Sequence, residues 1–250
     1  MDENKKVALV TGSSKGIGKA IAIRLAKDGY FVYVTYNTDE AGGHTTVNEI
    51  EQNGGKASLK SLDVSNEKSV IEIMDTIKKE SGHLDVLINN AEKDIIKNFE
   101  EYTFDEWKMA FNTKVHGAFL CTKYAIPLLK KSNNANIIMN SSSADENPPV
   151  DAISYATATA ALTSLTKSFA IHLPKYGIRV NAVMPGEVRT ANWGPVEKDE
   201  AMWKLFAENN LMKRVATVED VADAIMPLIN DPHKFLNGNF LYVNGGNHLK

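Results

Sequence analysis

The stretch Val7-Ala8-Leu9-Val10-Thr11-Gly12-Ser13-Ser14-Lys15-Gly16-Ile17-Gly18 decides the fold. Its four leading apolar residues predict a short buried strand, and apolar side chains then recur at helical spacing as far as Lys27. The glycines between strand and helix allow a tight turn, and a helix amino end presents unpaired N–H groups to an anion. This context favours a pyrophosphate-binding turn, and the alternative is an ordinary strand-to-helix connection.

Strand-like and helix-like segments alternate along the rest of the chain. Apolar runs predict strands at 7–10, 31–34, 57–62, 84–88, 136–139, 178–183 and 240–243. Helical periodicity predicts helices at 16–27, 40–53, 66–81, 104–129 and 154–175. Such alternation predicts a single-domain α/β Rossmann fold over residues 1–250, with a doubly wound seven-stranded parallel sheet and helices on both faces. The irregular stretch 186–216 is a candidate substrate lid, since ligands bind at the carboxyl ends of such strands.

Composition excludes several classes of protein. The chain has 250 residues, a net charge of -3 and 43% hydrophobic residues, which suits a globular protein and argues against nucleic-acid coating. Cys121 is the only cysteine, so no internal disulfide can form, and the six histidines lack metal-ligand spacing. No apolar run is long enough to span a bilayer, and no signal-peptide pattern is present. The expected address is the cytoplasm, with no nucleic-acid or membrane partner.

Further motifs follow the later strands. They are Asp63-Val64, Asn89-Asn90-Ala91, Asn112 on a helix, Ser142 with Tyr155 13 residues on, and Pro185-Gly186 with Thr190. With these motifs the chain resembles the short-chain dehydrogenase/reductases over essentially its whole length, closest to the β-ketoacyl-acyl-carrier-protein reductase type. The resemblance implies hydride transfer between a nicotinamide and a carbonyl or alcohol substrate, with a 3-oxoacyl thioester among the candidates. It also implies a homodimer or homotetramer built on the helices at 104–129 and 154–175.

The resemblance also assigns residues to the cofactor. The set is Gly12, Ser14, Lys15, Gly16, Ile17, Gly18, Tyr36, Asp63, Val64, Asn90, Ala91, Pro185, Gly186, Val188 and Thr190. An acidic residue at the end of the second strand would favour NAD, and a cation would favour NADP. The second strand ends Thr35-Tyr36-Asn37-Thr38, and Lys15 stands where a 2′-phosphate contact is implied, so NADP is expected over NAD. The alternative for Lys15 is a solvated loop lysine.

The catalytic positions carry one departure from the family. The resemblance makes Tyr155 the proton donor, Ser142 the residue that holds the substrate oxygen, and Asn112 the support of a proton-relay water. The family places a lysine four residues after the tyrosine, where its charge lowers the tyrosine pKa from about 10. Here that position is Thr159, which carries no charge. General acid–base catalysis contributes roughly 10²–10⁴-fold, so a substantial loss is expected.

The second departure is Glu92, which replaces the glycine of the family's Asn-Asn-Ala-Gly motif. A carboxylate there adds bulk and negative charge beside a polyanionic ligand, unless the side chain points to solvent. Two hypotheses follow: an NADP-dependent oxidoreductase with a degenerate Tyr-x-x-x-Lys motif, or an inactive family member that serves as a binding or regulatory subunit. No metal is expected in either case.

Overall fold

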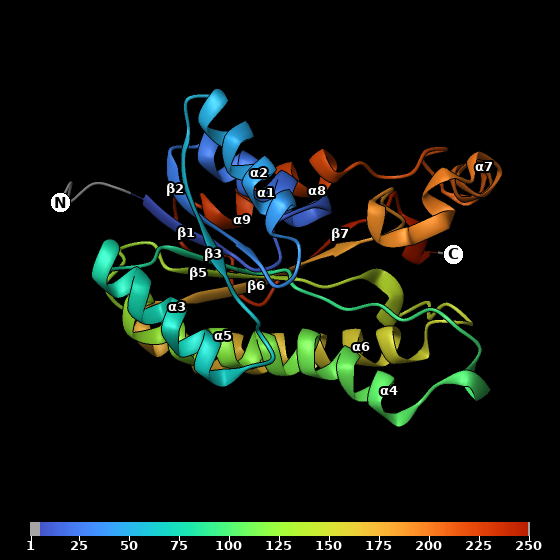
Figure 1. Cartoon of the computed structure of the whole chain (residues 1–250), viewed down its shortest axis with the longest axis horizontal. Coiled ribbons are helices and arrows are strands. Elements are labelled where there is room, and N and C mark those ends of the chain that lie inside the picture. The colour runs from blue at the N-terminus through green and yellow to red at the C-terminus, as the bar shows by residue number, and fades with distance from the viewer. Residues whose placement is uncertain (1–5, 250) are drawn as a thin grey trace.

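The chain forms one parallel sheet between two layers of helices (Figure 1). The computed structural model describes residues 6–249, apart from the side chains at 192 and 194–196, so residues 1–5 and 250 of the predicted domain lie outside the described residues. The strands are β1 (Lys6–Val10), β2 (Tyr30–Tyr36), β3 (Lys56–Ser61), β4 (Val86–Asn89), β5 (Asn136–Asn140), β6 (Arg179–Pro185) and β7 (Phe240–Val243). The sheet order is β3-β2-β1-β4-β5-β6-β7, and every neighbouring pair is parallel. The predicted fold class is confirmed.

Two apolar cores hold the layers together. Helices α1 (Gly16–Lys27), α2 (Glu40–Gln52), α8 (Val218–Ala224) and α9 (Met226–Ile229) lie on one face of the sheet. Helices α3 (Glu67–Glu80), α5 (Gly117–Leu129) and α6 (Ile153–His172) lie on the other, and α4 (Phe104–Phe111) leads into α5. Alternate side chains of each central strand enter opposite cores: Leu9 packs with α3 and α5, whereas Val10 packs with α1 and α8. This two-sided burial explains why the strands are continuous apolar runs.

The structure differs from the sequence prediction in its helices. The expected helix 104–129 is interrupted by a π-helical turn at Asn112–His116, between α4 and α5. Helix α7 (Glu200–Asn209), α8 and α9 lie between β6 and β7, where the prediction placed only an irregular stretch and a gap. Their apolar stretches are too short to show periodicity in the sequence. The π turn matters more, because it contains a buried charged side chain.

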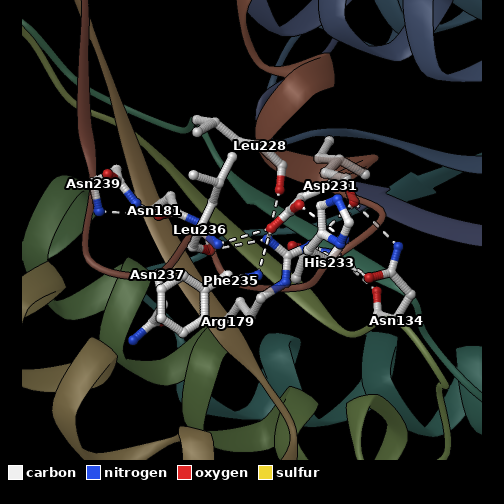
Figure 2. A network of polar contacts seen from close by, with 12 residues as sticks. Asn134, Arg179, Asn181, Leu228, Asp231, His233, Phe235, Leu236, Asn237 and Asn239 are labelled. Carbon is white, nitrogen blue, oxygen red and sulfur yellow. Dashed lines mark hydrogen bonds and ion pairs between the residues drawn. The ribbon is translucent and has the colours of Figure 1, made fainter.

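The amino end of β6 carries a buried arginine that ties the last connection to the sheet (Figure 2). The Arg179 guanidinium donates to the carbonyl oxygens of Leu228 at 2.8 Å, Leu236 at 2.9 Å and Ile229 at 3.1 Å. Asp231 lies 3.8 Å from the same group and accepts from the backbone N–H groups of the turn that follows it. Arg179 therefore fixes the 228–236 segment, which leads into β7, from the edge of the sheet opposite the strand carboxyl ends.

Candidate functional site

The turn after β1 has the shape that an anionic ligand requires. Gly12 and Gly16 have φ angles of +61° and +57°, which L side chains rarely adopt. A Cβ on Gly18 would lie 2.4 Å from the Asn90 side-chain nitrogen and from the Gly12 carbonyl oxygen. Helix α1 then begins after Lys15, and no described side chain caps it. The turn thus leaves helix N–H groups for a ligand, and the residues present fit a dinucleotide pyrophosphate.

A polar brace holds this turn against β4. The Asn90 side chain donates to the carbonyl oxygens of Thr11 and Gly12, both at 2.9 Å, and accepts from Asn140 at 2.8 Å. The backbone N–H groups of Asn90 and Ala91 donate to the Thr11 hydroxyl. These residues join the carboxyl ends of β1, β4 and β5, at the point where the strand order reverses and ligands bind in such sheets. Asn90, predicted to bind cofactor, is placed here as a support of the loop.

Two hydroxyl groups meet beside this brace. Ser142 follows β5, and Tyr155 stands in the first turn of α6. Burial raises the pKa of Tyr155 first of all, whereas the charge of Lys114 and a hydrogen bond from Ser142 lower it. Ser142 is itself buried, and its hydroxyl accepts from the Ala144 N–H at 3.2 Å. The structure therefore brings together the serine and tyrosine that the sequence spacing predicted.

Helix α6 supplies no positive charge to Tyr155. Thr159, one turn on, is fully buried, and its hydroxyl has no hydrogen-bond partner among the described residues. Lys167, two turns further, lies over the ring of Phe240, with 5.6 Å between its Nζ and the ring centroid. The cation near Tyr155 has to come from another element.

That cation is Lys114, in the π turn between α4 and α5. Its Nζ lies 4.2 Å from the centroid of the Tyr155 ring and 2.8 Å from Glu92 Oε2, and the residue is 4% exposed. Desolvation lowers the pKa of Lys114, but attraction to Glu92, Tyr155 and Asp94 outweighs it and holds this pKa above its ordinary value. Glu92 is thus paired with Lys114, and its side chain is only 20% exposed.

A second carboxyl group completes the cluster. Asp94 has one oxygen, Oδ1, that is buried without a hydrogen-bond partner among the described residues. Burial and the neighbouring charge of Glu92 raise the pKa of Asp94 to about 7, against the attraction of Lys114 and Lys93. At neutral pH the cluster therefore holds one firm ion pair and one carboxyl group that titrates near physiological pH.

Asn112 does not join this cluster. Its side chain is exposed, and its Oδ1 lies 2.9 Å from His116 Nδ1, one turn along. At helical spacing Asn112 shares a face with His116 and Phe119, both exposed, and its support of a proton-relay water stays a prediction. The sequence contained one sign of Lys114: at helical spacing it shares a face with Ala118 and Cys121, both buried.

The comparisons with known proteins agree with this geometry. A family model described as enoyl-(acyl carrier protein) reductase matches residues 12–248. Glucose 1-dehydrogenase 2 of Bacillus subtilis (strain 168) is 34% identical over 247 residues, which cover 98% of this chain and 95% of that protein. The chain is a short-chain dehydrogenase/reductase. It belongs to a family of oxidoreductases.

Solved structures similar to this short-chain dehydrogenase/reductase include ketoreductases and dehydrogenases. LugOII, titled a promiscuous reductase that catalyses keto-reduction at C1 in lugdunomycin biosynthesis, superposes with a TM-score of 0.90 at 31% identity, and the match covers 97% of this chain and 98% of that one. The angucycline C-6 ketoreductase LanV, solved with bound NADP, gives a TM-score of 0.89 at 27% identity, covering 98% of this chain and 96% of that one.

The remaining predicted cofactor residues of this short-chain dehydrogenase/reductase are arranged around the loop. The methyl carbon of Thr190 would lie 3.6 Å from a Cβ on Gly16, so the segment after β6 reaches the phosphate turn. Gly186 has no room for a Cβ, which would lie 2.7 Å from Asn244. In the same segment Val188 is buried and pairs with Ala216, and Pro185 ends β6.

Three other residues make local contacts. Asp63 accepts from the backbone N–H and the hydroxyl of Ser65, at 2.9 and 2.7 Å, so its carboxylate is already engaged. Val64 lines a small cavity with Lys114 and Gly117. Tyr36 ends β2, and its hydroxyl is held by Glu40, which raises the pKa of Tyr36. Of these, Val64 and Tyr36 stand at the expected carboxyl edge, whereas the Asp63 carboxylate is committed to a turn.

The segment 186–216 contains a packed aromatic group rather than an open apolar stripe. The rings of Trp193, Trp203 and Phe206 contact one another with centroids 5.3 to 5.5 Å apart, and Trp203 is buried. Both indole N–H groups donate to carbonyl oxygens of the same segment. Leu205 and Met212 remain exposed. This segment is thus a small unit with its own core at the carboxyl edge of the sheet.

Within the described residues, 6–249, the structure has neither a membrane-spanning helix nor a cluster of metal ligands. No helix in that range is long and apolar enough to cross a membrane. No group of three or more His, Cys, Asp and Glu side chains in the same range could hold a metal ion.

Cys121 is fully buried, and burial raises the pKa of its thiol to about 12. This thiol therefore stays protonated and unreactive at neutral pH.

Proposed function

We propose that this chain is an NADP(H)-dependent oxidoreductase that interconverts a carbonyl and an alcohol on a small molecule. The observation that carries the proposal is the proximity of Ser142 to the Tyr155 hydroxyl, beside the turn that fits a dinucleotide. When bound, the nicotinamide supplies or accepts the hydride. In reduction Tyr155 gives its proton to the substrate oxygen, which Ser142 holds by a hydrogen bond, and in oxidation Tyr155 takes the proton back.

The preference for NADP rests on charge at the end of β2. Lys15 is exposed beside the phosphate turn, and no ion pair ties it to another described residue. Asp39, the first carboxylate after β2, accepts from the Gly42 N–H at 3.0 Å as the cap of α2. An exposed lysine and a committed aspartate favour a 2′-phosphate over a free 2′-hydroxyl. The related ketoreductase LanV, which carries NADP in its crystal structure, supports this choice.

Lys15→Ala tests the choice of cofactor. We expect it to weaken NADPH binding about fivefold, the value of one solvent-exposed charge contact. NADH binding should stay within about twofold, because NADH lacks the 2′-phosphate. The measurement is nicotinamide fluorescence in titrations of both cofactors. Equal weakening of NADPH and NADH would contradict a 2′-phosphate contact.

The alternative function is that of an inactive binding or regulatory subunit. The observation in its favour is Thr159, which leaves the position one turn after Tyr155 on α6 without a cation. Titration with NADPH and NADH separates the two functions first, because an enzyme has to bind one of them. A panel of carbonyl compounds then follows: a cyclic ketone, an aldose, a diketone and a 3-oxoacyl thioester. Binding without turnover on this panel, for wild type as for Tyr155→Phe, would favour the inactive subunit.

The substrate enters where the 186–216 segment faces the strand ends. We propose that this segment, with its Trp193, Trp203 and Phe206 core, is a lid that excludes water while proton and hydride move. The exposed side chains of Leu205 and Met212 supply apolar surface for a substrate. Truncating either to Ala should raise KM for an apolar ketone and leave NADPH binding unchanged.

We further propose a homodimer or homotetramer built on α5 and α6. Phe119 and Ile171 are exposed on these helices, and Phe119 stacks on Phe169 of the neighbouring helix with ring centroids 6.5 Å apart. Contiguous apolar side chains on two adjacent helices are typical of a subunit interface. Light scattering should give a multiple of the 27.5 kDa chain mass. Phe119→Glu should dissociate the assembly, and a monomeric wild type would refute the proposal.

A further inference from the structure

Tyr155 has an electrostatic requirement that its own helix does not meet. A phenol has a pKa of about 10, and burial at this site raises it further. To give up and regain a proton near neutral pH, the phenolate needs a positive charge within a few ångströms. Thr159, on the same face of α6, carries none. Tyr155 therefore needs a cation from an element other than α6 to act as an acid near neutral pH.

Lys114 meets this requirement from the neighbouring helix. Its ammonium stands over the face of the Tyr155 ring at 4.2 Å from the centroid. A cation in that position stabilises the electron-rich ring and, more strongly, a phenolate whose charge is shared with the ring. The π turn at Asn112–His116 contains this residue. A turn of this kind often marks a functional position in a helix.

Glu92 fixes the position of the ammonium. Its Oε2 lies 2.8 Å from Lys114 Nζ, and the two side chains are 20% and 3% exposed. A flexible lysine that is nearly buried needs such a partner, since an unpaired buried charge is costly. Glu92, which stands in place of the family's glycine, therefore holds the Lys114 ammonium in position.

We propose that Lys114 is the positioning residue that stabilises the ionised form of Tyr155, and that Glu92 holds Lys114 in place. The two departures from the family, Thr159 and Glu92, are then parts of one rearrangement, in which the cation has moved from α6 to the π turn. The inference rests on the proposed function only in that Tyr155 is the acid. Lys114 acts through Tyr155 and makes no bond to the substrate.

The other charges around Tyr155 oppose Lys114 without cancelling it. The charged groups that act on this phenol are Lys114, Glu92 and Asp94. Lys114 lowers the pKa of Tyr155 more than Glu92 raises it, and Asp94 acts more weakly than Glu92. Because Asp94 has a pKa of about 7, it is partly protonated at neutral pH and its repulsion is then reduced. A cation at the ring face is therefore effective despite the two carboxyl groups.

Nitration of Tyr155 by tetranitromethane tests the inference without turnover or cofactor. The reagent attacks the phenolate, so the rate at fixed pH follows the ionised fraction, and mass spectrometry reads it at this residue. We expect Lys114→Met to slow nitration of Tyr155 roughly tenfold or more, which corresponds to a pKa raised by about one unit. Lys114→Arg should restore most of the rate because it keeps the charge. Lys167→Met, on the same helix as Tyr155, is the matched control and should stay within about twofold.

A double-mutant cycle separates this role from mere neutralisation of Glu92. Glu92→Gln with Lys114→Met removes both members of the pair and leaves no unpaired buried charge, so this variant should fold. If Lys114 acts on Tyr155, the double variant nitrates at least about fivefold more slowly than Glu92→Gln alone. Equal rates in these two variants would overturn the inference. An unchanged rate in Lys114→Met would overturn it as well.

Returning the cation to α6 gives the complementary test. Thr159→Lys in the Lys114→Met background should recover the nitration rate and, where wild type turns over, the neutral-pH limb of kcat/KM. In the wild-type background the same change adds a second cation beside Lys114 and should gain little. NADPH fluorescence on every variant reports the proposed function separately. If wild type does not bind NADPH, the proposed function is refuted. If wild type binds NADPH but Lys114→Met does not slow nitration of Tyr155, only the role of Lys114 is refuted.

Discussion

The protein buries two long cations at opposite edges of its sheet, and their surroundings differ. Arg179, at the amino end of β6, has three backbone carbonyl oxygens within 3.1 Å and the Asn134 side chain at 3.3 Å (Figure 2). Lys114, at the carboxyl edge, has one hydrogen-bond acceptor among the described residues, Glu92, and lies over an aromatic ring. The first cation is bound mainly by backbone carbonyl oxygens, whereas the second contacts only side chains that can change their protonation.

The difference shows what each edge does. Carbonyl oxygens do not titrate, and backbone N–H groups together with Arg179 hold the pKa of Asp231 below its ordinary value, so the Arg179 site keeps its charge around neutral pH. Around Lys114, Asp94 titrates near pH 7, and Asp94 and Thr159 each have a buried oxygen without a partner among the described residues. Buried polar atoms without partners are costly and cluster where function requires them. We infer from this contrast that the amino edge stabilises the fold and that the carboxyl edge carries the proposed chemistry.

Tyr155→Phe should have the largest effect of any change at the carboxyl edge. It removes the hydroxyl that the Lys114 site serves, and we expect kcat to fall roughly 10²–10⁴-fold, the contribution of a general acid. The free energy of unfolding should change by less than about 1 kcal/mol, since the ring remains. Steady-state assays and urea denaturation measure the two quantities. Tyr176→Phe, just beyond the far end of α6, is the control, and equal losses in both variants would contradict a catalytic role.

Arg179→Met should have the opposite profile. Its removal takes the guanidinium donors from three carbonyl oxygens and the counter-charge from Asp231, and breaking a buried pair costs about 3–5 kcal/mol. We expect urea denaturation to show a loss of about that size. The affinity for NADPH at temperatures where the variant is folded should remain within about twofold, because the site lies at the other edge. A stable variant with impaired cofactor binding would reverse the roles assigned to the two edges.

Asp94→Asn tests the titrating member of the Lys114 site. The folded-state pKa of Asp94, about 7, lies above its ordinary value of 3.8, so the folded protein holds a proton that the unfolded chain releases. Stability from this group is therefore complete below about pH 4 and is lost as the pH rises to about 7. Asn cannot ionise, so the variant should be more stable than wild type by roughly 1–3 kcal/mol at pH 8 and about equal at pH 4.

Urea denaturation at the two pH values measures this difference directly. The matched control is Asp105→Asn on α4, an exposed carboxylate whose Oδ1 lies 2.7 Å from Lys108. It should show no gain between pH 4 and pH 8. A gain for Asp94→Asn that is the same at both pH values would mean that burial of this carboxyl does not raise its pKa.

The sequence predicted the parts of this molecule that local patterns determine. Continuous apolar runs identified the strands because both faces of the sheet are buried, and Gly12, Gly16 and Gly18 identified the turn because a side chain fits at none of them without strain or collision. The spacing of Ser142 and Tyr155 predicted that they share a site, and the structure places the two residues close together. Each of these features depends on residues close in the chain or on a repeat along one element.

The parts that the sequence did not predict depend on tertiary contacts. Lys114 and Glu92 are 22 residues apart, and a lysine in the middle of a helix normally belongs to a solvated face. Asn112 shares a helix face with the exposed His116 and Phe119, whereas Lys114 shares one with the buried Ala118 and Cys121. Thr159 and Glu92 were identified as departures, but their connection through Lys114 needed the structure.

Thr159→Val should have the smallest effect, and it tests whether a buried hydroxyl at the carboxyl edge lacks a partner. Thr159 is fully buried and its hydroxyl has no partner among the described residues, whereas the donors of Arg179 are matched to carbonyl oxygens. Valine has the same shape without the hydroxyl, so the free energy of unfolding should rise by about 1 kcal/mol. Thr159→Ser, which keeps the hydroxyl and loses the methyl group, should be less stable than wild type by a similar amount. If Val destabilises the protein instead, the hydroxyl has a partner such as an ordered water, and the carboxyl edge is better satisfied than its protein contacts suggest.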